Sequence, residues 1–329
     1  MYLWFWEVIM RIMVCGGAGF IGSHFIDYIL NKYPEDFVLC YDLLTYAGKV
    51  ENLKNCKNNK NFAFIKGDIC DKAGVERAVK QYNIDTVVNF AAQSHVDRSI
   101  DSPDEFLRTN VLGVNTLLQV VKEQNLNRFH QVSTDEVYGD IALDDFVTEF
   151  TESSPIAPSS AYSASKASAD LLVLAQRKTF NLPVTISRCG NNYGTRQHEE
   201  KLIPHFVMQA VNNNSLPLYG DGKNVRDWIH VLDHVKAIDL ILRKGELGEV
   251  YNVGASNLIC NLDIAKAILD ILQKPHSLIT FVSDRLGHDR KYSVNFDKIK
   301  KLGFKPEMQF ESCFKECVLA YKDKFLNKK

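Results

Sequence analysis

The chain has 329 residues, 46% of them hydrophobic, and a formal net charge of -1. This length allows one large domain or two ordinary ones, with a substantial core. Because a nucleic-acid or membrane surface normally requires a basic excess, the near-neutral charge argues against either as the main partner.

The N-terminal segment and the cysteines give no targeting or metal signal. Residues 1–9 are apolar and aromatic, but they lack a basic segment and are too short to span a membrane, so we interpret them as an N-terminal extension. The eight cysteines are scattered, and Cys313 and Cys317, which share a helical face, are too few for a zinc site. We therefore expect reduced, mostly buried thiols in a cytoplasmic protein.

A dinucleotide-binding pattern opens the ordered chain. An apolar run over 11–15 predicts a strand, and glycines 16, 17, 19 and 22 follow it before an amphipathic helix. Gly16 allows the tight turn, Gly19 lets the backbone approach a pyrophosphate, and Gly22 permits close helix packing. The N-terminus of the helix adds amide donors and a positive dipole for the phosphates.

An acidic residue ends the second predicted strand, over 37–41. This residue, Asp42, lies twenty residues after Gly22. A carboxylate at this position accepts hydrogen bonds from ribose hydroxyls and repels a 2'-phosphate, so the pattern favours NAD over NADP. The alternative is an aspartate that caps a helix or closes a turn, and the matching context disfavours it.

Strands and helices continue to alternate. Apolar runs predict further strands over 62–65 and 86–90, a long helix over 103–123, a fifth strand that ends at Thr134 and a sixth over 183–188. Such alternation gives right-handed crossovers and a parallel sheet covered on both faces. Ligands of these sheets lie beyond the carboxyl ends of the strands, where all the groups singled out here fall.

Two carboxyl groups follow the apolar run 129–132 directly. Thr134, Asp135 and Glu136 place a hydroxyl and two acids at the end of a strand. Because burying an unpaired charge costs far more than a turn requires, we interpret the pair as an acid and a base. The alternative is a pair of solvated turn carboxylates.

A phenol and an ammonium group lie four residues apart in the helix predicted to begin near Ala161. That spacing places Tyr162 and Lys166 on one helical face. We therefore expect the ammonium to lower the pKa of the phenol toward a working value.

The pattern loosens after the sixth strand. We expect an NAD-binding domain over 10–188 and a smaller substrate-binding domain over 189–329, with a segment near 225–245 returning to the main sheet. In the smaller domain, His288 beside Arg290 suits contact with a diphosphate or ribose. His95 and Asp97, in the first domain, are too few for a metal site.

Together these motifs resemble the extended short-chain dehydrogenase/reductase superfamily and, within it, the nucleoside-diphosphate-glucose 4,6-dehydratases. The resemblance covers essentially the whole chain, from Arg11 to beyond Tyr292. The glycine loop and the Tyr-x-x-x-Lys pair specify only the superfamily, whereas Thr-Asp-Glu followed by Val-Tyr-Gly specifies the dehydratases. The family is expected to have a Rossmann-like doubly wound parallel sheet, NAD as cofactor, a nucleoside-diphosphate glucose as substrate, and homodimers packed through two long helices.

The resemblance also implies residue roles. Tyr162 would take the C4 hydroxyl proton beside Thr134, Glu136 would remove the C5 proton, and Asp135 would protonate the departing C6 hydroxyl. The implied NAD contacts are Gly16, Gly19, Phe20, Ile21, Gly22, Asp42, Leu43, Thr45, Asp68, Ile69, Phe90, Ala91, Ala92, Ser94, Thr109, Tyr162, Lys166 and Asn192. The implied substrate contacts are Ser94, Thr134, Asn191, Lys201, Leu202, Pro217, Tyr219, Arg226, Asn261, His288, Arg290 and Tyr292, and no metal is expected.

Some features depart from the family pattern and some alternatives stay open. Gln93 stands where relatives often have Glu, Gly190 where Ser is common, and residues 195–199 replace a loop that usually contains proline.

A sugar-nucleotide 4-epimerase would share the glycine loop and the Tyr/Lys pair but would not need the adjacent acid and base. A non-catalytic NAD-binding regulator is the other alternative. The base is open between thymine and uracil, because one methyl group separates dTDP from UDP, although many relatives use dTDP-glucose.

Overall fold

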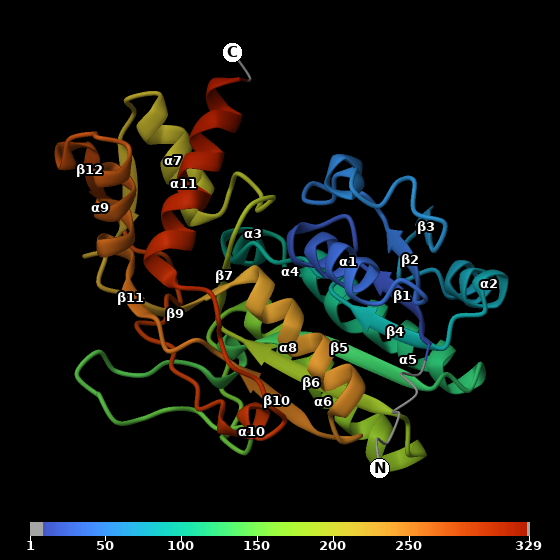
Figure 1. The fold of residues 1–329 in the computed structure, drawn as a ribbon. Coiled ribbons are helices and arrows are strands. Elements are labelled where there is room, and N and C mark those ends of the chain that lie inside the picture. The colour runs from blue at the N-terminus through green and yellow to red at the C-terminus, as the bar shows by residue number, and fades with distance from the viewer. Residues whose placement is uncertain (1–8, 328–329) are drawn as a thin grey trace, which may run out of the picture.

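The computed structural model describes residues 9–327, so all but the last residue of the expected N-terminal extension lie outside the described residues. Within 9–327, the strands form a seven-stranded main sheet, a three-stranded sheet and a two-stranded sheet (Figure 1). The strands of the main sheet, in spatial order, are β10 (Val250–Val253), β6 (Val184–Cys189), β5 (Arg128–Thr134), β4 (Thr86–Asn89), β1 (Arg11–Cys15), β2 (Phe37–Asp42) and β3 (Phe62–Lys66).

All neighbours in the main sheet pair in parallel, which confirms the predicted sheet. Its central strands read as near-continuous apolar runs because both faces are covered. Chain order runs outward in one direction through β2 and β3 and in the other through β4, β5 and β6. The reversal between β1 and β4 opens a crevice at the carboxyl ends of these two strands, where ligands of such sheets bind.

Helices cover both faces of the main sheet, as predicted for a doubly wound fold. Helices α1 (Phe20–Lys32) and α8 (Val231–Lys244) pack on one face, where α8 lies across the front of the sheet in Figure 1. Helices α2 (Lys72–Tyr82), α5 (Val114–Glu123) and α6 (Ala161–Phe180) pack on the other. Two separate apolar cores therefore hold the sheet between the helix layers.

The helix predicted over 103–123 is a helical run with an irregular middle. It comprises α4 (Pro103–Phe106), the π-helical η2 (Leu107–Gly113) and α5. Asn110 explains the wide turn, because its amide bonds both the N–H and the carbonyl of Gln93 and donates to Ser165 Oγ. A π turn of this kind commonly marks a functional site.

The C-terminal part forms a second layer above the carboxyl ends of the strands. Its core lies between α7 (Leu202–Val211), α9 (Asn261–Ile271) and α11 (Phe310–Leu326), which stand together in Figure 1. Its sheets join β7 (Asn191–Tyr193) and β11 (Leu258–Cys260) to β9 (Val225–His230), and β8 (Leu216–Tyr219) to β12 (Ile279–Val282). The short helices are η1 (Val50–Leu53), α3 (Val96–Asp101), η3 (Asp135–Tyr138), η4 (His276–Leu278) and α10 (Asp297–Lys300).

The chain returns to the main sheet after the second layer begins. In the segment predicted to return, 225–245, helix α8 packs on the main sheet, whereas β9 pairs with β7 and β11. The strand that joins the main sheet is β10, a few residues beyond that segment. The division into domains at residue 188 stays a prediction.

The cysteines of the described residues are unpaired, and most of them are buried. Cys313 and Cys317 lie buried on α11, and all eight cysteines carry free thiols. No helix between residues 9 and 327 combines the length and the apolar character needed to cross a bilayer. Over the same residues, no group of three or more His, Cys, Asp or Glu side chains gathers as a metal site would require.

Three histidines are buried as neutral rings against the main sheet. The His130 ring bonds Thr185 Oγ1 at 2.9 Å and Ser187 Oγ at 3.0 Å, which crosses from β5 to β6. Burial lowers the pKa of His130 to about 3, that of His234 to about 3 and that of His24 to about 4. The unfolded chain therefore binds more protons than the folded chain at any pH between these values and the ordinary histidine pKa.

We predict that the free energy of unfolding falls as pH drops below about 6.5, the ordinary histidine pKa, by up to about 1.4 kcal/mol per pH unit for each such histidine. Stability is fully present above the unfolded pKa and is lost as pH falls toward the folded pKa. Urea unfolding between neutral pH and about pH 4.5 measures the slope. His130→Asn should flatten the slope by one proton. Equal slopes for His130→Asn and the unaltered chain would contradict this account.

Candidate active site

A cavity of about 680 Å³ lies at the carboxyl ends of the main-sheet strands, and the glycine loop forms its floor. Gly16 has φ +73°, and a Cβ there would lie 2.6 Å from the backbone nitrogen of Ala91. A Cβ on Gly22 would lie 2.4 Å from the Gly16 carbonyl oxygen. The close approach of these backbones therefore requires glycine at both positions.

The N-terminus of α1 is prepared for an anion. Among the described residues, no side chain caps this helix end, and its first turn contains no acidic residue. The first residues of the helix, including Phe20 and Gly22, line the cavity, so free amide donors and the positive end of the helix dipole face it. This end suits a phosphate group.

Asp42 lies at the end of β2 and is oriented by the backbone. Its two oxygens accept hydrogen bonds from the amides of Ala18 at 2.9 Å and Leu44 at 2.7 Å. Burial raises the pKa of Asp42, and these two amides oppose the rise. Each oxygen keeps a second lone pair for a hydroxyl donor. Glycine backbone, uncapped amides and this carboxylate together fit a dinucleotide.

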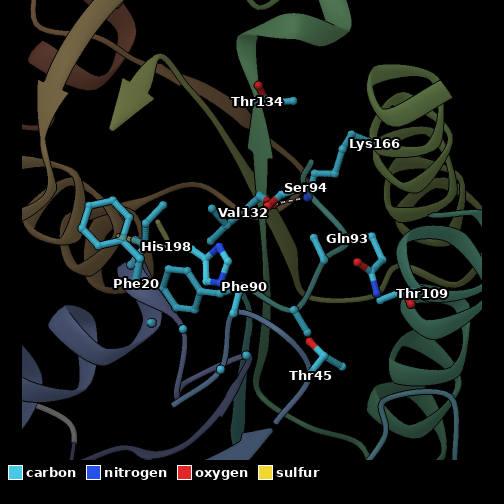
Figure 2. A pocket seen from close by; sticks show the side chains of 18 of the residues that line it. Phe20, Thr45, Phe90, Gln93, Ser94, Thr109, Val132, Thr134, Lys166 and His198 are labelled. Carbon is cyan, nitrogen blue, oxygen red and sulfur yellow. Dashed lines mark hydrogen bonds between the residues drawn. The ribbon is translucent and has the colours of Figure 1, made fainter. Parts of the chain in front are cut away.

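Every cofactor contact expected from the sequence lines this cavity. Figure 2 shows Phe20, Phe90 and His198 on one side and Gln93 and Thr109 on the other. The expected residues that line it are Gly16, Gly19, Phe20, Ile21, Gly22, Asp42, Leu43, Thr45, Asp68, Ile69, Phe90, Ala91, Ala92, Ser94, Thr109, Tyr162, Lys166 and Asn192. Their assignment as cofactor ligands stays a prediction.

Tyr162 and Lys166 share the cavity-facing side of α6, but their electrostatics differ from the expectation. Lys166 Nζ donates to the Val132 carbonyl oxygen at 2.6 Å, as Figure 2 shows. Burial and then the charge of Glu136 hold the pKa of Tyr162 well above its ordinary value, while the Thr134 hydroxyl opposes the rise. The expected lowering by Lys166 is therefore wrong for the chain by itself. A ligand that brought positive charge beside the phenol would lower its pKa.

The two adjacent carboxyl groups differ in environment. Thr134 Oγ1 lies 3.3 Å from Asp135 Oδ1, and Asp135 is only 1% exposed. Burial and then the charge of Glu136 hold the pKa of Asp135 well above its ordinary value. Burial also raises the pKa of Glu136, but the cations of Arg226, Arg285 and Lys201 oppose that rise. Burial and the charge of Glu136 therefore favour the protonated form of Asp135, whereas the three nearby cations favour the charged form of Glu136.

A second cavity of about 620 Å³ adjoins the first on the side of the C-terminal layer. Five residues line both cavities: Ser94, Glu136, Asn191, Glu200 and Lys201. The second cavity combines cationic side chains with an apolar patch that includes Leu202, Phe206 and Pro217. Glu136 therefore lies at the junction between a dinucleotide cavity and a cavity suited to an anionic ligand with an apolar portion.

The expected substrate contacts lie in these cavities, with Arg290 as the exception. Thr134 lines the first cavity, and the residues that line the second are Ser94, Asn191, Lys201, Leu202, Pro217, Tyr219, Arg226, Asn261, His288 and Tyr292. Arg290 Nη2 instead donates to both carboxylate oxygens of Asp221 at 2.9 Å, and Arg290 lines neither cavity. Arg285, from the same loop as His288, lines the second cavity in its place.

Sequence reasoning missed several residues of the site. Glu200 lies 3.4 Å from Arg98, 3.5 Å from His198 and 3.7 Å from His95, and it lines both cavities. The signal was present, because the Glu-Lys-Leu motif around Lys201 contains it. His198 belongs to the unusual loop 195–199 and packs edge-on against Tyr46, a contact that no local pattern indicates.

Comparisons with known proteins agree with the geometry. The chain matches the sequence model of the family described as GDP-mannose 4,6 dehydratase over residues 13–317. It is 47% identical over 312 residues to the low-salt glycan biosynthesis protein Agl12 of Haloferax volcanii, covering 95% of this chain and 98% of that protein. It is 45% identical over 333 residues to a dTDP-glucose 4,6-dehydratase of Haemophilus influenzae, covering 95% and 98%.

A solved structure extends the likeness to three dimensions. DesIV, a dTDP-glucose 4,6-dehydratase from Streptomyces venezuelae with NAD and TYD bound, has a TM-score of 0.92 and 44% sequence identity. The match covers 95% of this chain and 97% of that one. The similarity therefore includes both layers of the fold.

We predict that Arg226→Met raises the pKa of both Asp135 and Glu136, because it removes the cation that opposes the effect of burial on each. Carbon-13 NMR of labelled carboxyl groups as a function of pH measures both values. Arg226→Lys is the matched control, because it keeps a positive charge and should keep both pKa values near those of the unaltered chain. Unchanged titration in Arg226→Met would show that the guanidinium does not reach the pair.

Proposed function

The chain belongs to the GDP-mannose 4,6 dehydratase family, and on that premise we propose that it is an NAD-dependent dehydratase that acts on a nucleoside-diphosphate glucose, with dTDP-glucose as substrate and a 4-keto-6-deoxy sugar nucleotide as product. One observation carries the proposal. Glu136 lines both cavities, and the adjacent Asp135 lines the first. Burial raises the pKa of both groups, but the charge of Glu136 adds to the rise for Asp135, whereas the cations of Arg226, Arg285 and Lys201 oppose the rise for Glu136.

Water loss across C5 and C6 requires an acidic C5 proton, and a ketone at C4 makes it acidic. NAD, when bound, supplies a reversible hydride acceptor that takes hydride from C4 and later returns it to C6. The glycine loop, the α1 amides and Asp42 hold this cofactor. Because the cofactor ends as it began, the chain needs to retain it and does not need to exchange it.

Tyr162 receives the proton of the C4 hydroxyl while hydride leaves C4. The phenol lies buried in the first cavity beside Thr134, whose hydroxyl lowers its pKa and is in place to hydrogen-bond the same sugar oxygen. Lys166 lies one helical turn after Tyr162, and its Nζ is held by the Val132 carbonyl oxygen. When NAD is bound, positive charge beside the phenol would lower the pKa of Tyr162, and the phenol would then act as the general base.

Glu136 then removes the C5 proton and Asp135 donates a proton to the departing C6 hydroxyl, which leaves as water. When hydride adds to C6, Glu136 gives its proton back to C5, so that the product is the 4-keto-6-deoxy sugar. The cations around Glu136 favour its charged form, whereas burial keeps the proton on Asp135. Two side-by-side carboxyl groups thus perform opposite transfers because their surroundings separate their pKa values.

The second cavity receives the sugar nucleotide. Lys201, Arg226 and His288 line it and suit a diphosphate, and Arg226 is held by its contact with the Tyr292 ring at 4.3 Å. The apolar patch formed by Leu202, Phe206 and Pro217 suits a pyrimidine that carries a methyl group. This patch and the dTDP-glucose 4,6-dehydratases among the relatives favour thymine over uracil.

A sugar-nucleotide 4-epimerase is the nearest alternative. It would use Tyr162 and the dinucleotide cavity in the same way, but it gives no role to a protonated Asp135 beside a charged Glu136. Product mass separates the two reactions, because a dehydratase product is lighter by one water. An NAD-binding regulator would bind the cofactor without turnover of any nucleotide glucose.

We further infer a homodimer that buries one face of α6 and the helical run before it. Leu107, Leu112 and Leu171 are 49%, 59% and 55% exposed on these adjacent elements. An apolar surface of this kind on long neighbouring helices fits burial against a second copy. The cytoplasmic location stays a prediction.

We predict that Glu136→Gln abolishes water loss while hydride transfer from the sugar to NAD persists, because only the C5 proton transfer loses its base. The dehydration rate should fall by about 10² to 10⁴. Rapid-mixing absorbance follows reduced nicotinamide, and mass spectrometry follows the product. Glu123→Gln, on the surface of α5, is the control and should behave as the unaltered chain. Dehydration at the normal rate in Glu136→Gln would remove Glu136 from the mechanism.

Parallel assays with dTDP-glucose and UDP-glucose test the base preference. We expect kcat/KM to favour dTDP-glucose by about 10-fold or more, because one methyl group in an apolar pocket contributes roughly 1 to 3 kcal/mol. Leu202→Ala should lower kcat/KM for dTDP-glucose but not for UDP-glucose, so the preference between the two substrates should become smaller. A preference for UDP-glucose would overturn the assignment of thymine and leave the reaction intact.

A further inference from the structure

A buried ion pair lies directly behind the reactive groups. Asp170 on α6 is fully buried and Arg188 on β6 is 2% exposed, with Arg188 Nε donating to Asp170 Oδ2 at 2.8 Å. Burying two charges is costly, and apolar residues of similar volume often serve stability equally well. A pair in this position therefore requires an explanation other than stability.

The acidic member of the pair lies one helical turn after Lys166. Tyr162, Lys166 and Asp170 follow one another at intervals of four residues, so they share one face of α6. Burial lowers the pKa of Lys166, and Asp170 is the charged group that opposes this effect most strongly. The other titratable groups facing this region are Tyr162 on the same helix and Cys189 on β6.

The basic member reaches the turn that carries the two carboxyl groups. Arg188 Nη1 donates to Tyr138 Oη at 3.0 Å, and its guanidinium lies 4.9 Å from the centre of the Tyr138 ring. Tyr138 belongs to η3, together with Asp135 and Glu136, and its hydroxyl donates to Asn252 Oδ1 at 2.7 Å. Arg188 therefore bridges the helix that bears Tyr162 and Lys166 to the turn that bears the acid and the base.

We propose that Asp170 and Arg188 are positioning residues of the reaction: Asp170 is the counterion that keeps Lys166 charged, and Arg188 fixes the separation between helix α6 and turn η3. This inference rests on the proposed function. The pair has two roles, the counterion role of Asp170 and the bridging role of Arg188, and different substitutions test each role. Neither residue lines either of the two cavities, so neither contacts substrate or cofactor there.

The double variant Asp170→Asn with Arg188→Met tests the counterion. It removes both charges and leaves neither partner buried alone, so urea unfolding should remain close to that of the unaltered chain. Lys166 should lose its proton at lower pH, so that kcat at alkaline pH falls about tenfold or more relative to the unaltered chain, with KM within about twofold. Calorimetric titration with NAD should show a matching loss of affinity at alkaline pH.

The matched control is Asp239→Asn with Arg243→Met on α8. This pair is also largely buried, with Arg243 Nε 2.8 Å from Asp239 Oδ1, but it lies on the opposite face of the main sheet. The control should change urea unfolding but should not change how kcat or NAD affinity depends on alkaline pH. A shift of equal size in both double variants would overturn the counterion role, as would the absence of a shift in the first.

Arg188→Lys tests the bridge. A single ammonium keeps the charge beside Asp170 but cannot also reach Tyr138 with a fork of donors. In this variant, the pH at which kcat and NAD affinity fall should be the same as in the unaltered chain, and KM should not change. Because turn η3 is held less firmly, kcat should be about tenfold lower. A kcat equal to that of the unaltered chain would overturn the bridging role. Arg188→Lys tests this role even if the double variant does not fold.

Different results would contradict the proposed function and the positioning role of Asp170 and Arg188. If the unaltered chain releases no water from either nucleotide glucose, the proposed function is wrong, while the NAD titrations still measure the effect of Asp170 on Lys166. If the unaltered chain is active and the first double variant keeps its normal alkaline profiles for both kcat and NAD affinity, the pair has no positioning role.

Discussion

The reversal of strand order between β1 and β4 is the constraint on which the rest of the structure depends. It brings the carboxyl ends of adjacent parallel strands to one edge and leaves a crevice that the helices cannot fill. The glycine loop after β1, the carboxylate at the end of β2 and the Thr-Asp-Glu sequence at the end of β5 all reach this crevice because each lies at the carboxyl end of a strand. The second layer then closes it from above and adds a cavity lined by both cationic and acidic side chains.

Burial and counter-charge together determine the chemistry of the crevice. The same low-polarity surroundings raise the pKa values of Asp135, Glu136 and Tyr162 and lower those of Lys166 and Lys201. The protein separates these groups by the placement of guanidinium groups, which act on the carboxyl pair from the substrate side. Reactive protonation states near neutral pH are therefore a property of the assembled layers.

Several sequence predictions depended only on local pattern, and these agree with the structure. The strand that ends at Asp42, the strand that delivers Thr134 and the helix that begins at Ala161 lie where periodicity and turn residues placed them. The long helix over 103–123 differed because a buried Asn110 from the helix bonds the chain after β4, which is a contact across the fold. Arg290 differed for a similar reason, since its partner Asp221 lies in another loop.

The sequence by itself determined the parallel α/β fold, the glycine loop and which side chains follow the carboxyl ends of the strands. It could do so because each of these depends on spacing within one element or between an element and the turn that follows it. Only the tertiary structure decided which charges act on each of the two carboxyl groups, that Lys166 bonds Val132, and that Arg285 rather than Arg290 lines the second cavity. These outcomes depend on burial and on charges from distant segments, and such terms exist only after the layers have packed.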